Sequence, residues 1–333
     1  MSSLAFKYPN KISLANIPTP LTPLDRLSEK YGGPRIWLKR DDLTGSTLSG
    51  NKVRKLEYVI ADALDNGADS LITCGGLQSN HCRATAMAGA QLGLDVHLLL
   101  REEGGSDIDG NLLMDHLAGA KVDRIDRKTY FSSLPKIFKE KQDQLINAGK
   151  TPYLIPTGAS DEVGIWGYIS CVSELIEDFQ RNHINPDLIV CATGSGGTQA
   201  GLTLGASLYN LKAQILSYAV CDSAEYFASR VKDDVTSCLE RYGIDWDINR
   251  LSINTNDGYI GPGYAKGYPE LFSTIQEVCR LEGVLLDPVY TGKAFHGLLT
   301  DIKLGKFSGL SDVVFIHTGG IFGVFPYRDQ FKK

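Results

Sequence analysis

The chain has 333 residues, of which 43% are hydrophobic, and it carries a formal net charge of -5 at pH 7. This length and composition allow a large buried core in two domains or lobes, and they exclude a largely disordered chain. The acidic balance leaves no broad basic surface, so we expect neither nucleic acid nor an anionic membrane as a partner, and a small-molecule enzyme fits better.

The cysteines and the N-terminal residues indicate the cellular compartment of the protein. Seven cysteines are scattered along the chain without a CxxC pair, which favours a reduced compartment over a disulfide framework and indicates no zinc or other metal site. Residues 1–20 lack the pattern of a signal peptide. No segment reaches the roughly 20 apolar residues of a membrane helix. We therefore expect a cytoplasmic protein.

Apolar runs alternate with helix-periodic segments along most of the chain, a pattern typical of an α/β fold with two mostly parallel sheets. We predict strands at residues 35–40, 70–74, 96–100, 153–155, 187–192, 215–220 and 313–317. We predict helices that start at Asn51 and near Thr198, and further helices over residues 80–92, 112–118, 134–148, 164–180 and 271–282. Residues 102–110 form a polar connector.

Lys52 lies in a small polar turn between an apolar strand and a helix for which Asn51 can serve as the N-cap. In the first helical turn, the helix dipole and the neighbouring Arg54 and Lys55 disfavour the ammonium form of Lys52. A partly deprotonated amine can form a Schiff base with a carbonyl compound. On the turn alone, an ordinary solvated lysine is the alternative interpretation.

Three predicted strands run into small-residue turns, at residues 74–81, 192–201 and 317–320. Ligands of open α/β sheets bind at such carboxyl ends. The turn at residues 194–198 can bind an anion through backbone N–H groups and a helix N-terminus, although it matches neither the GxGxxG nor the Walker pattern. A ligand-free tight turn is the alternative. Together with Lys52, this turn points to a coenzyme with both a phosphate and an aldehyde, pyridoxal 5'-phosphate.

Several motifs occur in an order that resembles the D-cysteine desulfhydrase and 1-aminocyclopropane-1-carboxylate (ACC) deaminase family of fold-type II pyridoxal-phosphate enzymes. They are residues 17–21, 49–57, 75–81, 193–198, 287–293 and 317–320. The resemblance implies two lobes, each with a mostly parallel twisted sheet flanked by helices, and the coenzyme in the cleft between them. The large lobe would comprise residues 1–52 and 166–333, and the small lobe residues 53–165. It also implies a homodimer that acts on a small amino-acid substrate.

The resemblance further implies roles for individual residues. Lys52 would bind the coenzyme as an imine, Asn80 would hydrogen-bond the ring's phenolic oxygen, and Thr318 would face the ring nitrogen and so favour elimination. The catalytic residues implied are Lys52, Ser79, Tyr264 and Tyr290. The coenzyme-binding residues implied are Asn51, Lys52, Lys55, Asn80, Thr193, Gly194, Ser195, Gly196, Gly197, Thr198, Tyr290, Thr318 and Gly319. The substrate-binding residues implied are Ser79, Asn80, His81, Tyr264 and Thr291.

Structural roles are the competing interpretation for several of these residues. The tyrosines could be core residues with a satisfied hydroxyl, and Ser79 or Asn80 could cap the helix that follows. His81 and His317 are expected to be structural or second-sphere groups, and Cys82 to pack a helix. By their sequence context, Glu57 and Lys293 are expected to be surface charges.

Within the family, the resemblance favours D-cysteine desulfhydrase, which converts D-cysteine to pyruvate, ammonia and hydrogen sulfide by β-elimination. ACC deaminases carry a glutamate and a leucine where this chain has Thr291 and Thr318. L-cysteate sulfo-lyase and ACC deaminase stay as alternatives, because residues 321–326 are bulkier than the corresponding desulfhydrase segment. A sulfonate would need extra cationic donors, which the sequence does not place.

Two alternatives from other classes are a nicotinamide-dependent oxidoreductase and a non-catalytic binding protein. The first lacks a dinucleotide fingerprint in this sequence, and the second lacks a secretion signal.

Overall fold

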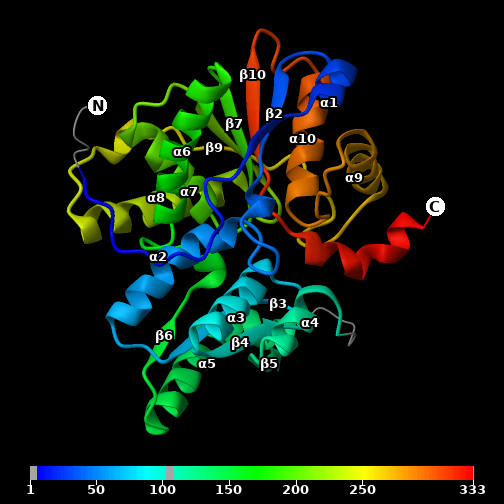
Figure 1. The fold of residues 1–333 in the computed structure, drawn as a ribbon. Coiled ribbons are helices and arrows are strands. Elements are labelled where there is room, and N and C mark those ends of the chain that lie inside the picture. Colours follow the sequence, from blue (N-terminus) through cyan, green and yellow to red (C-terminus); the bar gives the residue numbers. More distant parts are fainter. Residues whose placement is uncertain (1–5, 103–107, 333) are drawn as a thin grey trace.

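A computed structural model describes residues 6–102 and 108–332, which form two β-sheets surrounded by helices (Figure 1). The strands are β1 (Leu21–Pro23), β2 (Arg35–Lys39), β3 (Ser70–Gly76), β4 (Asp95–Arg101), β5 (Lys121–Ile125), β6 (Pro152–Leu154), β7 (Leu188–Thr193), β8 (Gln214–Ala219), β9 (Asn254–Asn256) and β10 (Asp312–Ile316). The helices are α1 (Asp25–Tyr31), α2 (Asn51–Asp65), α3 (Asn80–Leu92), α4 (Gly110–Leu117), α5 (Arg127–Asn147), α6 (Trp166–Asn182), α7 (Gly197–Leu208), α8 (Ala224–Tyr242), α9 (Pro269–Glu282) and α10 (Thr291–Lys303). Short 3-10 segments are η1 (Asp41–Leu43), η2 (Thr157–Ala159), η3 (Ile248–Arg250) and η4 (Ile321–Phe331).

The two sheets differ in size and in the part of the chain that they use. The six-stranded sheet has the order β1-β2-β10-β7-β8-β9, and all its neighbouring strands are parallel except β1 and β2. The four-stranded sheet has the order β5-β4-β3-β6 and is parallel throughout. Its strands fall between β2 and β7 in sequence, so the chain leaves the large sheet, builds the small one and returns. The lobe boundaries at residues 52/53 and 165/166 stay a prediction.

Helices cover both faces of the large sheet, which explains why its central strands β7 and β10 are apolar on both faces over most of their length. On β10, Val313 and Phe315 pack in a core with α9 and α10, whereas Val314 and Ile316 pack in a second core with α6 and α7. Successive strand residues point to opposite faces, so a strand covered on both sides is a continuous apolar run. Figure 1 shows α9 and α10 on one side of this sheet and α6 and α7 on the other.

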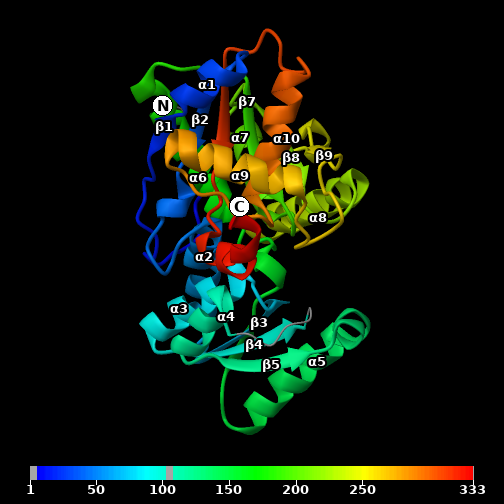
Figure 2. The same cartoon turned by 90° about the vertical axis from the view of Figure 1, so that its right-hand side faces the viewer.

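The small sheet follows the same rule with different helices. Leu71 and Leu98 face the core shared with α2 and α3, whereas Ile72 and Leu99 face a smaller core closed by Tyr130 and Leu145 of α5. In Figure 2 this sheet and α5 form the lower part of the molecule, below α2. The carboxyl ends of the β3 and β7 strands therefore face the region between the two sheets, where the small-residue turns begin.

The predicted strands agree with the structure to within two residues, and the α/β class with two mostly parallel sheets is confirmed. The predicted helix at residues 134–148 begins earlier, at Arg127, because the Asp126 side chain caps the helix by accepting a hydrogen bond from the Thr129 N–H. The predictions did not include β1, β5, β9, α1, α8 and α10. The predicted connector at residues 102–110 lies partly outside the described residues.

The seven cysteines are free thiols, and Cys82 of α3 is fully buried in the core, as expected for a packing role. Within residues 6–102 and 108–332, no helix combines the length and the apolar character that crossing a bilayer requires.

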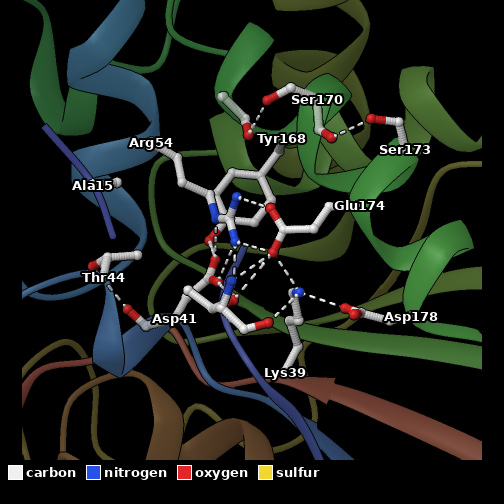
Figure 3. A network of polar contacts seen from close by, with 12 residues as sticks. Ala15, Lys39, Asp41, Thr44, Arg54, Tyr168, Ser170, Ser173, Glu174 and Asp178 are labelled. Atoms are coloured by element: carbon white, nitrogen blue, oxygen red, sulfur yellow. Dashed lines mark hydrogen bonds and ion pairs between the residues drawn. The ribbon is translucent and has the colours of Figure 1, made fainter. Parts of the chain in front are cut away.

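A buried ionic network joins the start of α2 to β2, η1 and α6 (Figure 3). The Arg54 guanidinium donates to Asp41 at 2.8 Å and to Glu174 at 2.9 Å, and both Arg54 and Asp41 are almost fully buried. The Lys39 amine is 2.5 Å from both Glu174 and Asp178. Burial alone would raise the pKa of Glu174, but Arg54 and Lys39 lower it to about 2. The network therefore keeps Glu174 ionised and fixes α2 two residues beyond Lys52.

We predict that Arg54→Met destabilises the protein by about 3–5 kcal/mol, because it leaves the buried carboxylates of Asp41 and Glu174 without their main cation. Urea unfolding of the coenzyme-free protein measures this change. Arg40→Met is the matched control, because Arg40 pairs with Asp42 at a partly exposed site where such a pair contributes about 1 kcal/mol or less. Equal destabilisation by the two substitutions would contradict a structural role for the buried network.

Candidate active site

The small-residue turns meet at a cavity of about 350 Å³ between the two sheets. The end of β3 and the turn after it contribute Gly75, Gly76 and Ser79. The end of β7, the turn after it and the start of α7 contribute residues 193–196 and Thr198. Thr318 after β10 and the first two residues of α2 complete this side. The predicted site residues that line the cavity are Asn51, Lys52, Ser79, Asn80, His81, Thr193, Gly194, Ser195, Gly196, Thr198, Tyr264, Tyr290 and Thr318.

Lys52 is the second residue of α2, and its amine donates a hydrogen bond to the Asn51 side-chain oxygen at 3.1 Å. The amine lies 5.8 Å from the ring centroid of Tyr290. Burial lowers the pKa of Lys52 to about 8; Arg83 reinforces this effect and Asp287 opposes it. The direction is the one expected from the sequence, but the cause is different, because burial and Arg83 act in place of Arg54 and Lys55.

Two glycines allow α2 to start against the end of β10. Gly50 has a φ of +101°, and a Cβ on it would lie 2.7 Å from the Thr318 carbonyl oxygen. A Cβ on Gly319 would lie 2.7 Å from the Gly50 Cα atom. The expected N-cap role of Asn51 is wrong, because Gly50 occupies that position without a side-chain cap and the Asn51 N–H donates to the Thr318 carbonyl at 3.1 Å. The Asn51 amide instead donates to the Thr198 hydroxyl at 2.9 Å.

The N-terminus of α7 forms the anion-binding part of the cavity wall. This helix starts at Gly197, and its N-cap Gly196 provides no side-chain cap, so the first-turn N–H groups other than that of Gly197 are available to a ligand. Ser160 accepts a hydrogen bond from the Gly197 N–H at 3.1 Å and one from the Lys55 amine at 3.1 Å. A Cβ on Gly197 would lie 2.9 Å from the Lys55 amine. The cradle therefore depends on the absence of a side chain at Gly197.

The groups around this cradle fit a phosphate. Lys55 is fully buried and forms no ion pair within the described part of the chain. Its pKa is lowered well below the ordinary value by burial and by Lys52. The Thr193 hydroxyl is buried without a hydrogen-bond partner among the described residues. A buried amine, an unpartnered hydroxyl and a helix N-terminus together match the acceptor oxygens and the negative charge of a phosphate monoester.

Tyr264 and Tyr290 form a hydrogen-bonded pair in the cavity wall. Their hydroxyl oxygens are 2.5 Å apart, and their rings meet edge to face with centroids 6.0 Å apart. The Asp287 carboxylate accepts hydrogen bonds from the N–H groups of Val289 and Tyr290 at 2.8 and 2.9 Å, which fixes the turn before α10. Burial, followed by the adjacent Tyr264, raises the pKa of Tyr290 well above its ordinary value, so this phenol stays protonated.

The start of α3 carries the remaining predicted polar groups. Ser79 caps α3 by accepting a hydrogen bond from the Cys82 N–H at 3.1 Å, and it also lines the cavity. The Asn80 oxygen accepts from the Asn111 amide at 2.9 Å. His81 pairs with the Thr73 hydroxyl at 2.8 Å, and burial lowers its pKa well below the ordinary value, so the ring is neutral.

The other predicted site residues lie behind the cavity wall. Lys55 and Gly197 form the back of the anion cradle, and Gly319 packs against Gly50. Thr291 is buried, and its hydroxyl donates to the Asp287 carboxylate at 2.8 Å, so the structure does not place it in the cavity. His317 is bound between the Gly319 N–H and the Leu285 carbonyl, each at 3.1 Å, which matches the expected structural role.

Sequence reasoning missed several residues of the cavity wall. Thr157 and Gly158 follow β6, and the small residues after this strand repeat the signal that identified the other three turns. Arg101 at the end of β4 and Arg127 at the start of α5 place two guanidinium groups in the wall. The Arg101 guanidinium lies 5.5 Å from the Tyr264 ring centroid, which links the small sheet to the tyrosine pair.

Two residues that were expected at the surface are buried. Glu57 is 2% exposed and accepts hydrogen bonds from the N–H groups of Leu14 and Ala15, both at 2.9 Å, which ties the N-terminal segment to α2. Lys293 is fully buried and donates to the carbonyls of Ile260 and Gly263. Both expectations were wrong because the backbone groups that hydrogen-bond to each charged side chain come from a distant segment of the chain.

Comparison with known proteins agrees with this geometry. The family model described as "Pyridoxal-phosphate dependent enzyme" matches residues 12–319. The bifunctional D-cysteine desulfhydrase/1-aminocyclopropane-1-carboxylate deaminase of Arabidopsis thaliana is 42% identical over 332 residues, which cover 96% of this chain and 80% of the relative. The D-cysteine desulfhydrase of Yersinia pestis (strain Pestoides F) is 36% identical and covers 96% of both chains.

A solved structure gives the same result for the fold. The crystal structure of an ACC deaminase homologue superposes with a TM-score of 0.89 at 37% identity, covering 99% of this chain and 98% of that chain. The architecture is therefore the fold-type II one that the motifs indicated, with pyridoxal phosphate as the coenzyme of the family. The chain belongs to the D-cysteine desulfhydrase and ACC deaminase family of pyridoxal-phosphate dependent lyases.

Proposed function

We propose that the enzyme is a D-cysteine desulfhydrase that releases pyruvate, ammonia and hydrogen sulfide by β-elimination. The observation that carries this proposal is the Lys52 amine, with its pKa lowered to about 8, in a cavity that also contains the hydrogen-bonded Tyr264–Tyr290 pair, in which Tyr290 stays protonated. The Lys52 amine suits removal of a proton from the substrate, and the tyrosine pair suits donation of a proton to the leaving group. We also propose a homodimer, as the resemblance implies.

In this proposal the cavity walls divide the task of holding the coenzyme. The N-terminus of α7 and Lys55 would bind the phosphate, Asn80 would donate to the phenolic oxygen, and Thr318 would face the ring nitrogen. When bound, the coenzyme supplies an electron sink for the negative charge that develops at the substrate Cα atom. A hydroxyl such as that of Thr318 does not hold a proton on the ring nitrogen as a carboxylate would, which favours elimination over slower side reactions.

The side chains around the reacting atoms would then move the protons. The Lys52 amine removes the proton from Cα, because a base with a pKa close to the working pH is both available and strong enough. The Ser79 hydroxyl binds the substrate carboxylate from the start of α3. The Tyr264–Tyr290 pair donates a proton to the departing sulfur, and the raised pKa of Tyr290 keeps that proton in place until it is needed.

The position of Thr291 supports desulfhydrase over ACC deaminase. Its hydroxyl is engaged with Asp287 behind the cavity wall. An ACC deaminase would carry a glutamate here, and this chain has no carboxylate at that position. Opening of a cyclopropane ring would therefore lack an acidic group that the resemblance associates with it.

L-cysteate sulfo-lyase is the second candidate, because Arg101 and Arg127 line the cavity. The Arg127 guanidinium stacks over the exposed Phe131 ring at 5.3 Å. Guanidinium groups bind sulfonate or carboxylate oxygens through charge-assisted hydrogen bonds, and these are the donors that a sulfonate side chain requires.

We predict that an assay of 2-oxo acid release gives the highest kcat/KM with D-cysteine. The substrates compared are D-cysteine, L-cysteine, L-cysteate, D-serine and β-chloro-D-alanine, which give pyruvate, and ACC, which gives 2-oxobutanoate. The value for ACC should be lower by about a hundredfold or more, because this chain has Thr291 where the resemblance places the glutamate of ACC deaminases. Formation of 2-oxobutanoate from ACC at a comparable rate would contradict the assignment. A highest kcat/KM with L-cysteate would establish the second candidate instead.

We predict that Arg127→Met raises the KM for L-cysteate about tenfold more than the KM for D-cysteine, because only L-cysteate presents a second anionic group. If L-cysteate is not turned over, its inhibition constant replaces KM. Lys128→Met is the control, since Lys128 is an exposed neighbouring cation that does not line the cavity. An equal effect on both ligands would exclude Arg127 as a sulfonate-binding residue.

A further inference from the structure

The segment between β9 and α9 carries Tyr264, and its backbone rests on a buried lysine. Lys293 lies in the first turn of α10, and its amine donates to the carbonyl oxygens of Ile260 at 2.7 Å and Gly263 at 2.6 Å. Gly263 directly precedes Tyr264, and Tyr290 directly precedes α10. One amine therefore connects the two chain segments that present the tyrosine hydroxyls.

This lysine is placed where its charge is unfavourable. Burial lowers the pKa of Lys293 to about 8, against the opposing effects of Cys221 and Asp287. The first turn of a helix, at the positive end of its dipole, also disfavours a cation. Lys293 forms no ion pair within the described residues, and the two carbonyls are its hydrogen-bond acceptors. An apolar side chain of similar length would avoid these costs, so the two hydrogen bonds are the benefit of having a lysine here.

The backbone of the segment needs such support. Ala265 has a φ of +56°, in the left-handed region that is uncommon for a residue other than glycine, and it follows Gly263, whose φ of +129° only glycine adopts readily. Strained backbone of this kind persists only where surrounding contacts fix it. Two further hydrogen bonds hold this segment. The Tyr259 hydroxyl donates to Asp301 of α10, and the Tyr327 hydroxyl of η4 donates to the Ala265 carbonyl.

We propose that Lys293 is a positioning residue that sets the Tyr264 hydroxyl against the Tyr290 hydroxyl. The proposal rests on the proposed function, in which this pair donates a proton to the leaving group. The separation of 2.5 Å between the two oxygens holds only while residues 260–264 stay fixed to the first turn of α10. A displacement of about 1 Å in a group that takes part in proton transfer can reduce turnover about a hundredfold.

A double-mutant cycle tests the proposal. Lys293→Met keeps the length of the side chain and removes both hydrogen bonds, and we expect it to lower kcat for D-cysteine about ten- to a hundredfold. The visible absorption of the bound coenzyme should be unchanged, because Lys52 and the α7 cradle are untouched. In a Tyr264→Phe background, the same substitution should change kcat by about twofold or less, because the group that it positions is already gone. Lys293→Arg, which retains donors, should recover part of the lost turnover.

The control is Lys303→Met, an identical change at an exposed lysine in the last turn of the same helix, which should leave kcat and KM unchanged. Multiplicative effects of Lys293→Met and Tyr264→Phe would overturn the positioning role. If Lys293→Met fails to fold, Lys293→Gln replaces it, since the glutamine amide is neutral and polar. Loss of folding in both variants would show a purely structural role and would also overturn the proposal.

Failure of the proposed function gives a different result. Native turnover by Tyr264→Phe would remove the tyrosine pair from the reaction, whatever the effect of Lys293→Met. A large effect of Tyr264→Phe together with independent effects of the two substitutions would leave the pair in the reaction and reject only the role of Lys293.

Discussion

The burial of one lysine amine, that of Lys52, is the constraint on which the chemistry of the cavity depends. An amine held among strand ends loses hydration, and its proton becomes easier to remove than in water. The pKa of about 8 follows from this loss, and Asp287 opposes it only partly. No catalytic use could follow if the chain left this side chain in solvent, where it would be a fully protonated cation at neutral pH.

The fold holds Lys52 from two directions. On one side, Gly50 and Gly319 bring the start of α2 against the end of β10 at a distance that a Cβ would not allow. On the other side, Arg54 is fixed by Asp41 and Glu174 in the buried network of Figure 3. Because both contacts lie within the first turn of α2 or directly before it, Lys52 has little freedom to move. The ionic network, which is remote from the cavity, thereby contributes to the geometry of the site.

The two sheets supply different parts of the cavity. The large sheet presents the N-terminus of α7 and the tyrosine pair, whereas the small sheet presents the start of α3 with Ser79 and Asn80. Arg101 reaches from β4 to the ring of Tyr264 and connects the two sides. A substrate between them would contact both sheets, so the relative placement of the sheets determines which side chains can act on it.

Much of this arrangement could be predicted from the sequence, and the reasons for the failures are physical. Central strands such as β7 and β10 are apolar on both faces, which makes them recognisable, and the turns after them consist of small residues. The short strands β1 and β9 and the amphipathic helix α8 do not combine a continuous apolar run with a following turn of small residues. Glu57 and Lys293 were misplaced at the surface because the backbone groups that satisfy them are supplied by residues 14–15 and 260–263, and sequence spacing does not reveal such partners. Arg127 was missed for the same reason, since its place in the cavity wall depends on how α5 crosses the small sheet.

The most direct measurement is borohydride reduction of the protein with its bound coenzyme, followed by mass spectrometry of the peptides. We expect the reduced pyridoxyl group on Lys52 alone, and its loss in Lys52→Ala with the fold retained. Modification of Lys55 or another lysine in the native protein, or no modification at all, would contradict the assignment of Lys52 as the residue that binds the coenzyme.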